Sequence, residues 1–219
     1  MDLDEVLRSA SIWRGRSGNP ATSATLATGL AELDQALPGG GWPLGALIEI
    51  MLERHGLGEL KLLMPALARL SREATDHGAH PQRWIVWVAP PFVPYAPALA
   101  SYGLELNRQL WVHPQRSSID DNSEVLWAME QALRSGSSAA VLAWVKRTDN
   151  TVLRRLQLAA EEGSSLAVLF RPQSAMQEAS PAALRLMLCR GEVGTDVEVL
   201  KCRGGYATTV RNVLPPSLS

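Results

Sequence analysis

The chain has 219 residues, a formal net charge of −1 and 46% hydrophobic residues. This length suffices for one α/β domain with a sizeable core, and the composition is that of an ordinary soluble protein. The near-zero charge excludes a global electrostatic footprint for nucleic acid, so contact with DNA is expected to be weak or indirect. The two cysteines fit a reducing cytosol. The sequence offers no signal peptide or membrane-spanning run, so we expect a cytoplasmic protein without membrane attachment.

The first 27 residues are predicted to be separate from a core that spans residues 28–219. Residues 1–13 have the spacing of an amphipathic helix, with an apolar face formed by Leu3, Val6, Leu7, Ile12 and Trp13. Residues 14–27 are rich in Gly, Ser, Thr, Asn and Pro, which is typical of a flexible tether. The helix is expected either to fold back on its own core or to dock on a partner protein.

In the core, apolar runs alternate with helical patterns. Helices are expected over residues 29–37, 60–70, 94–102, 125–135 and 150–162. Strands are expected over residues 46–51, 84–89, 110–113, 139–145, 166–170, 184–189, 196–203 and 206–214. This alternation predicts an α/β fold with a mostly parallel sheet and helices on both faces, and the closing strands predict an antiparallel C-terminal edge.

The tryptophans divide into two predicted groups. Those inside expected elements are predicted to pack in the core: Trp84, Trp87, Trp127 and Trp144. Those at element ends are candidates for an exposed interface: Trp13, Trp42 and Trp111.

The segment Thr28–Met51 reads TGLAELDQALPGGGWPLGALIEIM. A threonine-glycine, a leucine-aspartate pair, a Gly-rich turn and an apolar strand, in this order, resemble the entry to the RecA ATPase core. The resemblance covers roughly residues 25–214 and implies a RecA-like core in which a phosphate loop follows the strand. The segments that match the DNA-binding loops of RecA are short, and its separate C-terminal domain has no counterpart.

The phosphate loop implied by this resemblance is degenerate. A working G-x-x-x-x-G-K-[ST] loop uses glycines for close backbone approach, a lysine for the phosphates and a hydroxyl for magnesium. At the first glycine, second glycine, lysine and hydroxyl, this chain has Glu53, Gly58, Glu59 and Leu60, with Gly56 inside the loop. A carboxylate in the place of the lysine would repel a triphosphate.

Both catalytic acids of the resemblance are missing as well. Pro90 stands where the glutamate that activates water is expected, and Trp144 stands where the magnesium-coordinating aspartate is expected. We therefore expect a pseudo-ATPase without cofactor or metal, and an atypical nucleotide-binding ATPase is the enzymatic alternative. Lys201 and Arg203 match basic residues that reach the neighbouring subunit's nucleotide in RecA. They are candidate partner-binding residues or, alternatively, solvated charges on an edge strand.

Three motifs resemble the ImuA family of accessory proteins in bacterial translesion DNA synthesis: Ile12–Arg16, Pro38–Pro43 and Gly58–Leu60. The resemblance implies an SOS-induced mutasome protein that contacts RecA and ImuB, an inactive Y-family polymerase homologue, beside an error-prone C-family polymerase. A tethered N-terminal helix packs on the adjacent subunit in RecA, which favours docking of residues 1–13 on a RecA filament end or a partner. The alternative is the SulA family, which shares the inactive core and implies binding to the division GTPase FtsZ.

Overall fold

A computed structural model describes residues 24–76, 83–115 and 122–215. Its centre is an eight-stranded sheet in the order β10-β9-β8-β3-β7-β6-β4-β5. The strands are β3 (Ala46–Leu52), β4 (Trp84–Val88), β5 (Gln109–Val112), β6 (Ser138–Trp144), β7 (Leu166–Pro172), β8 (Leu184–Arg190), β9 (Thr195–Cys202) and β10 (Thr208–Leu214). The six strands from β8 to β5 are parallel, and β9 and β10 are antiparallel. The predicted α/β sheet with an antiparallel edge is confirmed.

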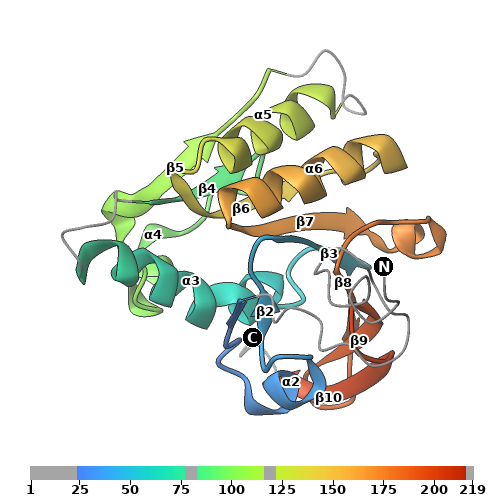
Figure 1. Cartoon of the computed structure of the whole chain (residues 1–219). Helices are drawn as coiled ribbons and strands as arrows, with labels where there is room; N and C mark the ends of the chain where they lie inside the picture. The colour runs from blue at the N-terminus through green and yellow to red at the C-terminus, as the bar shows by residue number, and fades with distance from the viewer. Residues whose placement is uncertain (1–23, 77–82, 116–121, 216–219) are drawn as a thin grey trace, which may run out of the picture.

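Helices cover both faces of this sheet (Figure 1). The α-helices are α2 (Ala31–Ala36), α3 (Glu59–Asp76), α4 (Ala96–Ser101), α5 (Ser123–Arg134) and α6 (Asn150–Gly163), and short 3-10 helices are η1 (Leu106–Arg108) and η2 (Gln173–Gln177). Helices α5 and α6 lie side by side on one face, and α3 and α4 lie on the other. Two large apolar clusters, one for each face, form most of the core of the described residues, and a small third cluster lies around Met51, Ala175 and Met187.

The helix α6 shows how the sequence sets an element's ends. It begins after Asp149, whose carboxylate accepts a hydrogen bond of 2.8 Å from the backbone N–H of Val152, and this bond satisfies a donor that the helix leaves unpaired. It ends at Gly163 and is followed by the capping residue Ser164, which adopts the left-handed conformation at φ 47°. Gly163 is required before that turn because a Cβ there would lie 2.1 Å from the carbonyl oxygen of Leu133. This close approach packs α6 against α5.

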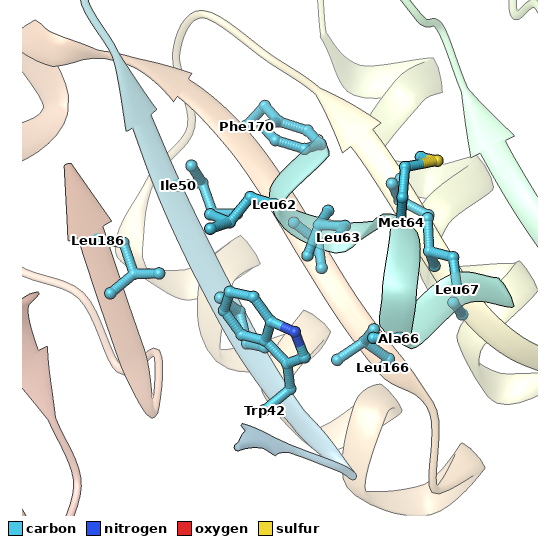
Figure 2. Packing of buried hydrophobic residues seen from close by; sticks show 14 of the residues in the cluster. Trp42, Ile50, Leu62, Leu63, Met64, Ala66, Leu67, Leu166, Phe170 and Leu186 are labelled. Carbon is cyan, nitrogen blue, oxygen red and sulfur yellow. The ribbon is translucent and has the colours of Figure 1, made fainter. Parts of the chain in front are cut away.

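The tryptophan predictions are partly wrong. Trp87 and Trp144 are buried as expected, whereas Trp84 and Trp127 are exposed. Trp42, expected at an interface, is fully buried under α3 among the side chains that Figure 2 shows. It lies in β2 (Trp42–Pro43), which pairs with β1 (Thr25–Leu26) in a small antiparallel sheet.

Three other predictions, on the end of the tether and on strands β8 and β9, are also corrected. The predicted tether cannot extend through Thr25 and Leu26, because these residues pair with β2 and Leu26 is buried. β8 is parallel to β3 rather than part of the antiparallel edge. β9 is not an edge strand, because β10 pairs with its outer side.

Candidate functional site

The carboxyl ends of the parallel strands border a cavity of about 950 Å³. Its walls come from the ends of β3, β4, β5, β6 and β7 and the loops that follow them, together with Asn122 and residues near η2. Ligands of open α/β sheets bind outside this edge, so this cavity is the candidate functional site. The structure brings three predicted positions together here: Glu53, Pro90 and Trp144.

The loop between β3 and α3 binds a carboxylate of its own chain through a backbone N–H. Gly56 and Gly58 adopt positive φ angles of 88° and 96°. The backbone N–H of Gly56 lies 2.9 Å and 3.1 Å from the two carboxylate oxygens of Glu59. His55 Nδ1 lies 3.9 Å from Glu59 Oε1. Glu59, the first residue of α3, is buried, and its negative charge compensates the positive end of the helix dipole.

This loop is fixed from the other side by the last two strands. Thr195 Oγ1 in β9 donates a hydrogen bond of 2.7 Å to the carbonyl oxygen of Leu57. A Cβ on Gly58 would lie 2.8 Å from Leu214 Cδ1 in β10. The loop is therefore packed against β9 and β10. Glu59 and the half-buried Leu60 are not among the described residues that line the cavity.

An aromatic stack occupies the position where the resemblance expects a magnesium ligand. Trp144, the last residue of β6, stacks on Phe170 with ring centroids 4.6 Å apart and planes at 15°. Its ring is 6.2 Å from that of Trp87 and nearly parallel to it. Pro90 lies in the loop after β4 and follows Ala89, which adopts a positive φ of 52°. Neither Pro90 nor Trp144 can supply a carboxylate to a metal or a water.

A buried charge cluster beside the cavity is the feature that sequence reasoning missed. Glu49 in β3 accepts a hydrogen bond of 3.0 Å from Arg171 Nη1, and its second oxygen lies 2.9 Å from Arg185 Nε. Arg171 also donates to Glu178 at 2.7 Å. Arg185 donates to the carbonyl oxygens of Ala175 and Met176 in η2. The sequence feature that could have indicated this cluster is the presence of three charged residues inside otherwise apolar strands: Glu49, Arg171 and Arg185.

The candidate basic residues lie apart from the cavity. Lys201 Nζ donates to the carbonyl oxygen of Ser180 at 2.7 Å. Burial, with the nearby charges of Arg185 and Arg203, lowers the pKa of Lys201. Arg203 is exposed and lies just beyond the end of β9. Neither residue is among the described residues that line the cavity, so the structure does not bring them to the degenerate loop.

Some of the candidate sites give no further geometry. The predicted partner-binding face of Leu3, Val6, Leu7, Ile12 and Trp13 lies outside the described residues. Within the described ranges, no three His, Cys, Asp or Glu side chains gather closely enough to hold a metal ion. Among the helices that the structure describes, none is long and apolar enough to cross a membrane.

Residues 45–167, more than half of the chain, match the protein family described as cell division inhibitor SulA. The chain belongs to the SulA family. Over 125 residues it is 33% identical to the cell division inhibitor SulA of Photorhabdus laumondii, a match that covers 57% of this chain and 63% of that protein. Over 157 residues it is 32% identical to protein ImuA of Caulobacter vibrioides, which covers 70% of this chain and 59% of that protein. The predicted likeness to ImuA and SulA proteins is confirmed.

The two curated relatives are matched over part of their length. The chain spans about 60% of the length of these two curated relatives. The crystal structure of SulA from Pseudomonas aeruginosa is 27% identical, and the match covers 57% of this chain and 97% of that one with a TM-score of 0.43.

Proposed function

We propose that the chain is a non-catalytic accessory protein of SOS-induced translesion DNA synthesis that works by contacting ImuB and RecA. The match to an ImuA protein supports this role, because it extends over 70% of the chain, whereas the match to the Photorhabdus SulA extends over 57%. An error-prone C-family polymerase would act beside the complex. In this proposal the core is RecA-like and has lost its nucleotide chemistry.

The observation that carries the non-catalytic part is the carboxylate of Glu59 on the backbone N–H of Gly56. In a working loop such N–H groups cradle a phosphate. Two unit negative charges at 4 Å repel each other by about 4 kcal/mol at the effective dielectric constant of a protein surface. A nucleotide would have to displace Glu59 or accept this repulsion, because Glu59 itself stands at the loop position of the lysine. Trp144 and Pro90 add no ligand for magnesium and no base for water.

The contact surfaces of this proposal are the amphipathic residues 1–13 and the exposed end of β9. Burial of the face Leu3, Val6, Leu7, Ile12 and Trp13 on a RecA filament end or on ImuB would need no phosphate chemistry. Each such apolar side chain contributes about 1.5–3 kcal/mol when fully buried, before ordering costs. Lys201 and Arg203 are candidates for a second, polar contact.

A second candidate function is inhibition of cell division through FtsZ. The family match over residues 45–167 and the 33% identity to a protein named cell division inhibitor favour it. The two roles differ in partner and not in chemistry.

A purified pull-down separates these roles. Tagged full-length chain is mixed in turn with ImuB, RecA and FtsZ, and the proposal expects ImuB and RecA to be retained. The double variant Leu7→Asp/Trp13→Asp is expected to lose RecA while remaining folded by circular dichroism. Retention of FtsZ alone would establish the division role and overturn the translesion role. Undiminished RecA binding by the folded double variant would show that residues 1–13 do not dock.

A further inference from the structure

The cavity at the carboxyl edge has a basic mouth. Arg54 in the loop after β3 and Lys146 and Arg147 in the loop after β6 all line it and are exposed. Within the described residues, Arg54 and Arg147 make no side-chain ion pair. Of the two acids that line the cavity, Glu178 is already bonded to Arg171. The mouth therefore offers positive charge to a ligand.

Three residues that line the cavity each carry a buried side-chain polar atom without a hydrogen-bond partner among the described residues. Trp144 is only 7% exposed, and its Nε1 has no partner among the described residues. Thr148 Oγ1 and Arg171 Nε are likewise buried without a partner among the described residues, and all three residues are among those that border the cavity. Buried polar groups of folded proteins are hydrogen-bonded in the large majority of cases. Indole and guanidinium nitrogens only donate, so the missing group is an acceptor.

The rim beside this mouth is apolar and solvent-exposed. Pro90 and Pro91 line the cavity, and the loop continues through Phe92 and Val93, which are 71% and 88% exposed. The ring of Phe92 lies edge-on to His55 with centroids 6.1 Å apart, which places it next to the loop that carries Arg54. Tyr95 is also exposed. Exposed apolar side chains that follow one another in a single loop favour an interaction surface.

We propose that this cavity and its rim bind an extended segment of a partner protein in which an acidic side chain stands next to apolar side chains. The carboxylate enters the cavity and accepts from Trp144 and Thr148 under the charge of Arg54. The neighbouring apolar side chains cover Phe92 and Val93. This inference rests on the proposed protein-binding function only in taking the ligand to be a protein segment.

The lining favours a single carboxylate over a chain of phosphates. Glu53 lines the cavity and would repel a polyphosphate or a nucleic-acid backbone, whereas one carboxylate can be placed away from it. Trp144 is buried, and its ring already stacks on Phe170, so it offers little surface on which a base could stack. Val93 and the prolines of the rim offer aliphatic surface, which suits leucine-like side chains.

The test is selection from a random peptide library displayed on phage, with immobilised full-length chain as bait. Arg54→Glu, Trp144→Phe and Val93→Ser each remove one part of the site, and Trp144→Phe removes the N–H while it keeps a stacking ring. Arg154→Glu is the matched control, because Arg154 is exposed on α6 and does not line the cavity. Selected peptides are resynthesised with a fluorophore and titrated by anisotropy.

The expected peptides carry Asp or Glu beside Leu, Ile or Phe. Arg54→Glu and Trp144→Phe should each weaken their binding about tenfold or more, as loss of a charge-assisted contact implies, and Arg154→Glu should change it less than about twofold. If Trp144→Phe fails to fold, Arg54→Glu decides, because that side chain is exposed. Peptides without acidic residues, no enrichment over the Arg54→Glu bait, or displacement by an equimolar single-stranded oligonucleotide would each overturn the proposal.

The pull-down with the same variants separates this site from the function above. If ImuB and RecA still bind to Arg54→Glu and no peptides are selected, the cavity is not the site and the accessory role stands. If acidic-apolar peptides are selected but neither protein is retained, the site stands and the accessory role is wrong.

Discussion

Replacing Glu49 by glutamine removes the carboxylate that two buried guanidinium groups share. The side chains of Glu49 and Arg171 are fully buried, and Arg185 is 9% exposed. Glutamine keeps one acceptor oxygen but no charge, so among the described residues Arg171 retains a carboxylate partner in the half-exposed Glu178, and Arg185 retains the carbonyl oxygens of η2. Breaking a buried ion pair by removing one partner costs about 3–5 kcal/mol, because an uncompensated charge stays buried.

The control for this variant is Glu178→Gln, which breaks the other ion pair of Arg171. Glu178 is 46% exposed, so its pair with Arg171 is screened by solvent and its loss should cost about 1 kcal/mol or less. Urea unfolding followed by circular dichroism measures both values. For a chain of this size, the Glu49→Gln variant should melt about 6–20 °C below the parent protein. A cost for Glu49→Gln that does not exceed that for Glu178→Gln would refute the buried-cluster reasoning.

Three further predictions concern backbone, thiols and DNA. Gly29→Ala should lower the free energy of unfolding in urea by more than Gly40→Ala does. Both glycines have a positive φ, which costs about 1–2 kcal/mol for alanine. At Gly29, but not at Gly40, the new Cβ would also lie 2.5 Å from Pro65 Cβ. Burial raises the pKa of the Cys189 and Cys202 thiols. Their alkylation near neutral pH should therefore be slower in folded than in urea-unfolded protein and should accelerate as the pH rises. Equal alkylation rates in folded and unfolded protein would contradict this. Binding of single-stranded DNA, measured by anisotropy, should be weak and strongly salt-dependent, and nanomolar affinity near physiological salt would contradict the charge argument.

The order of elements was predictable because the two hydrophobic periods alternate clearly along the chain. The helical period also predicts that Trp127 is exposed. It lies two residues after the buried Val125 and therefore on the opposite side of α5. The prediction that Trp127 packs in the core was made because the residue lies inside a helix, without asking which face of the helix it lies on. Trp42 was different, because its burial depends on α3 packing above it, and no local pattern records that contact.

The direction of β8 depended on the connection before it. Residues 173–183 connect β7 to β8 and include η2, which packs against Met51 and Met187. Because this connection returns to the starting end of the sheet, β8 begins at the same end as β3 and is parallel to it. A connection of about a dozen residues is long enough for such a parallel crossover without an α-helix. Of the candidate site, the positions of Glu53, Pro90 and Trp144 after the parallel strands were predictable from the order of elements. The bond from Gly56 to Glu59 and the unpaired donors under the cavity needed coordinates.

Isothermal titration of the full-length chain with ATP and magnesium tests the central claim most directly. The carboxylate of Glu59 on the loop, with Leu60, Pro90 and Trp144 where the proposal expects catalytic groups, predicts no binding heat at physiological ATP concentration and no phosphate release. Binding at micromolar ATP would contradict the account, because it would require the loop to exchange its own carboxylate for a phosphate.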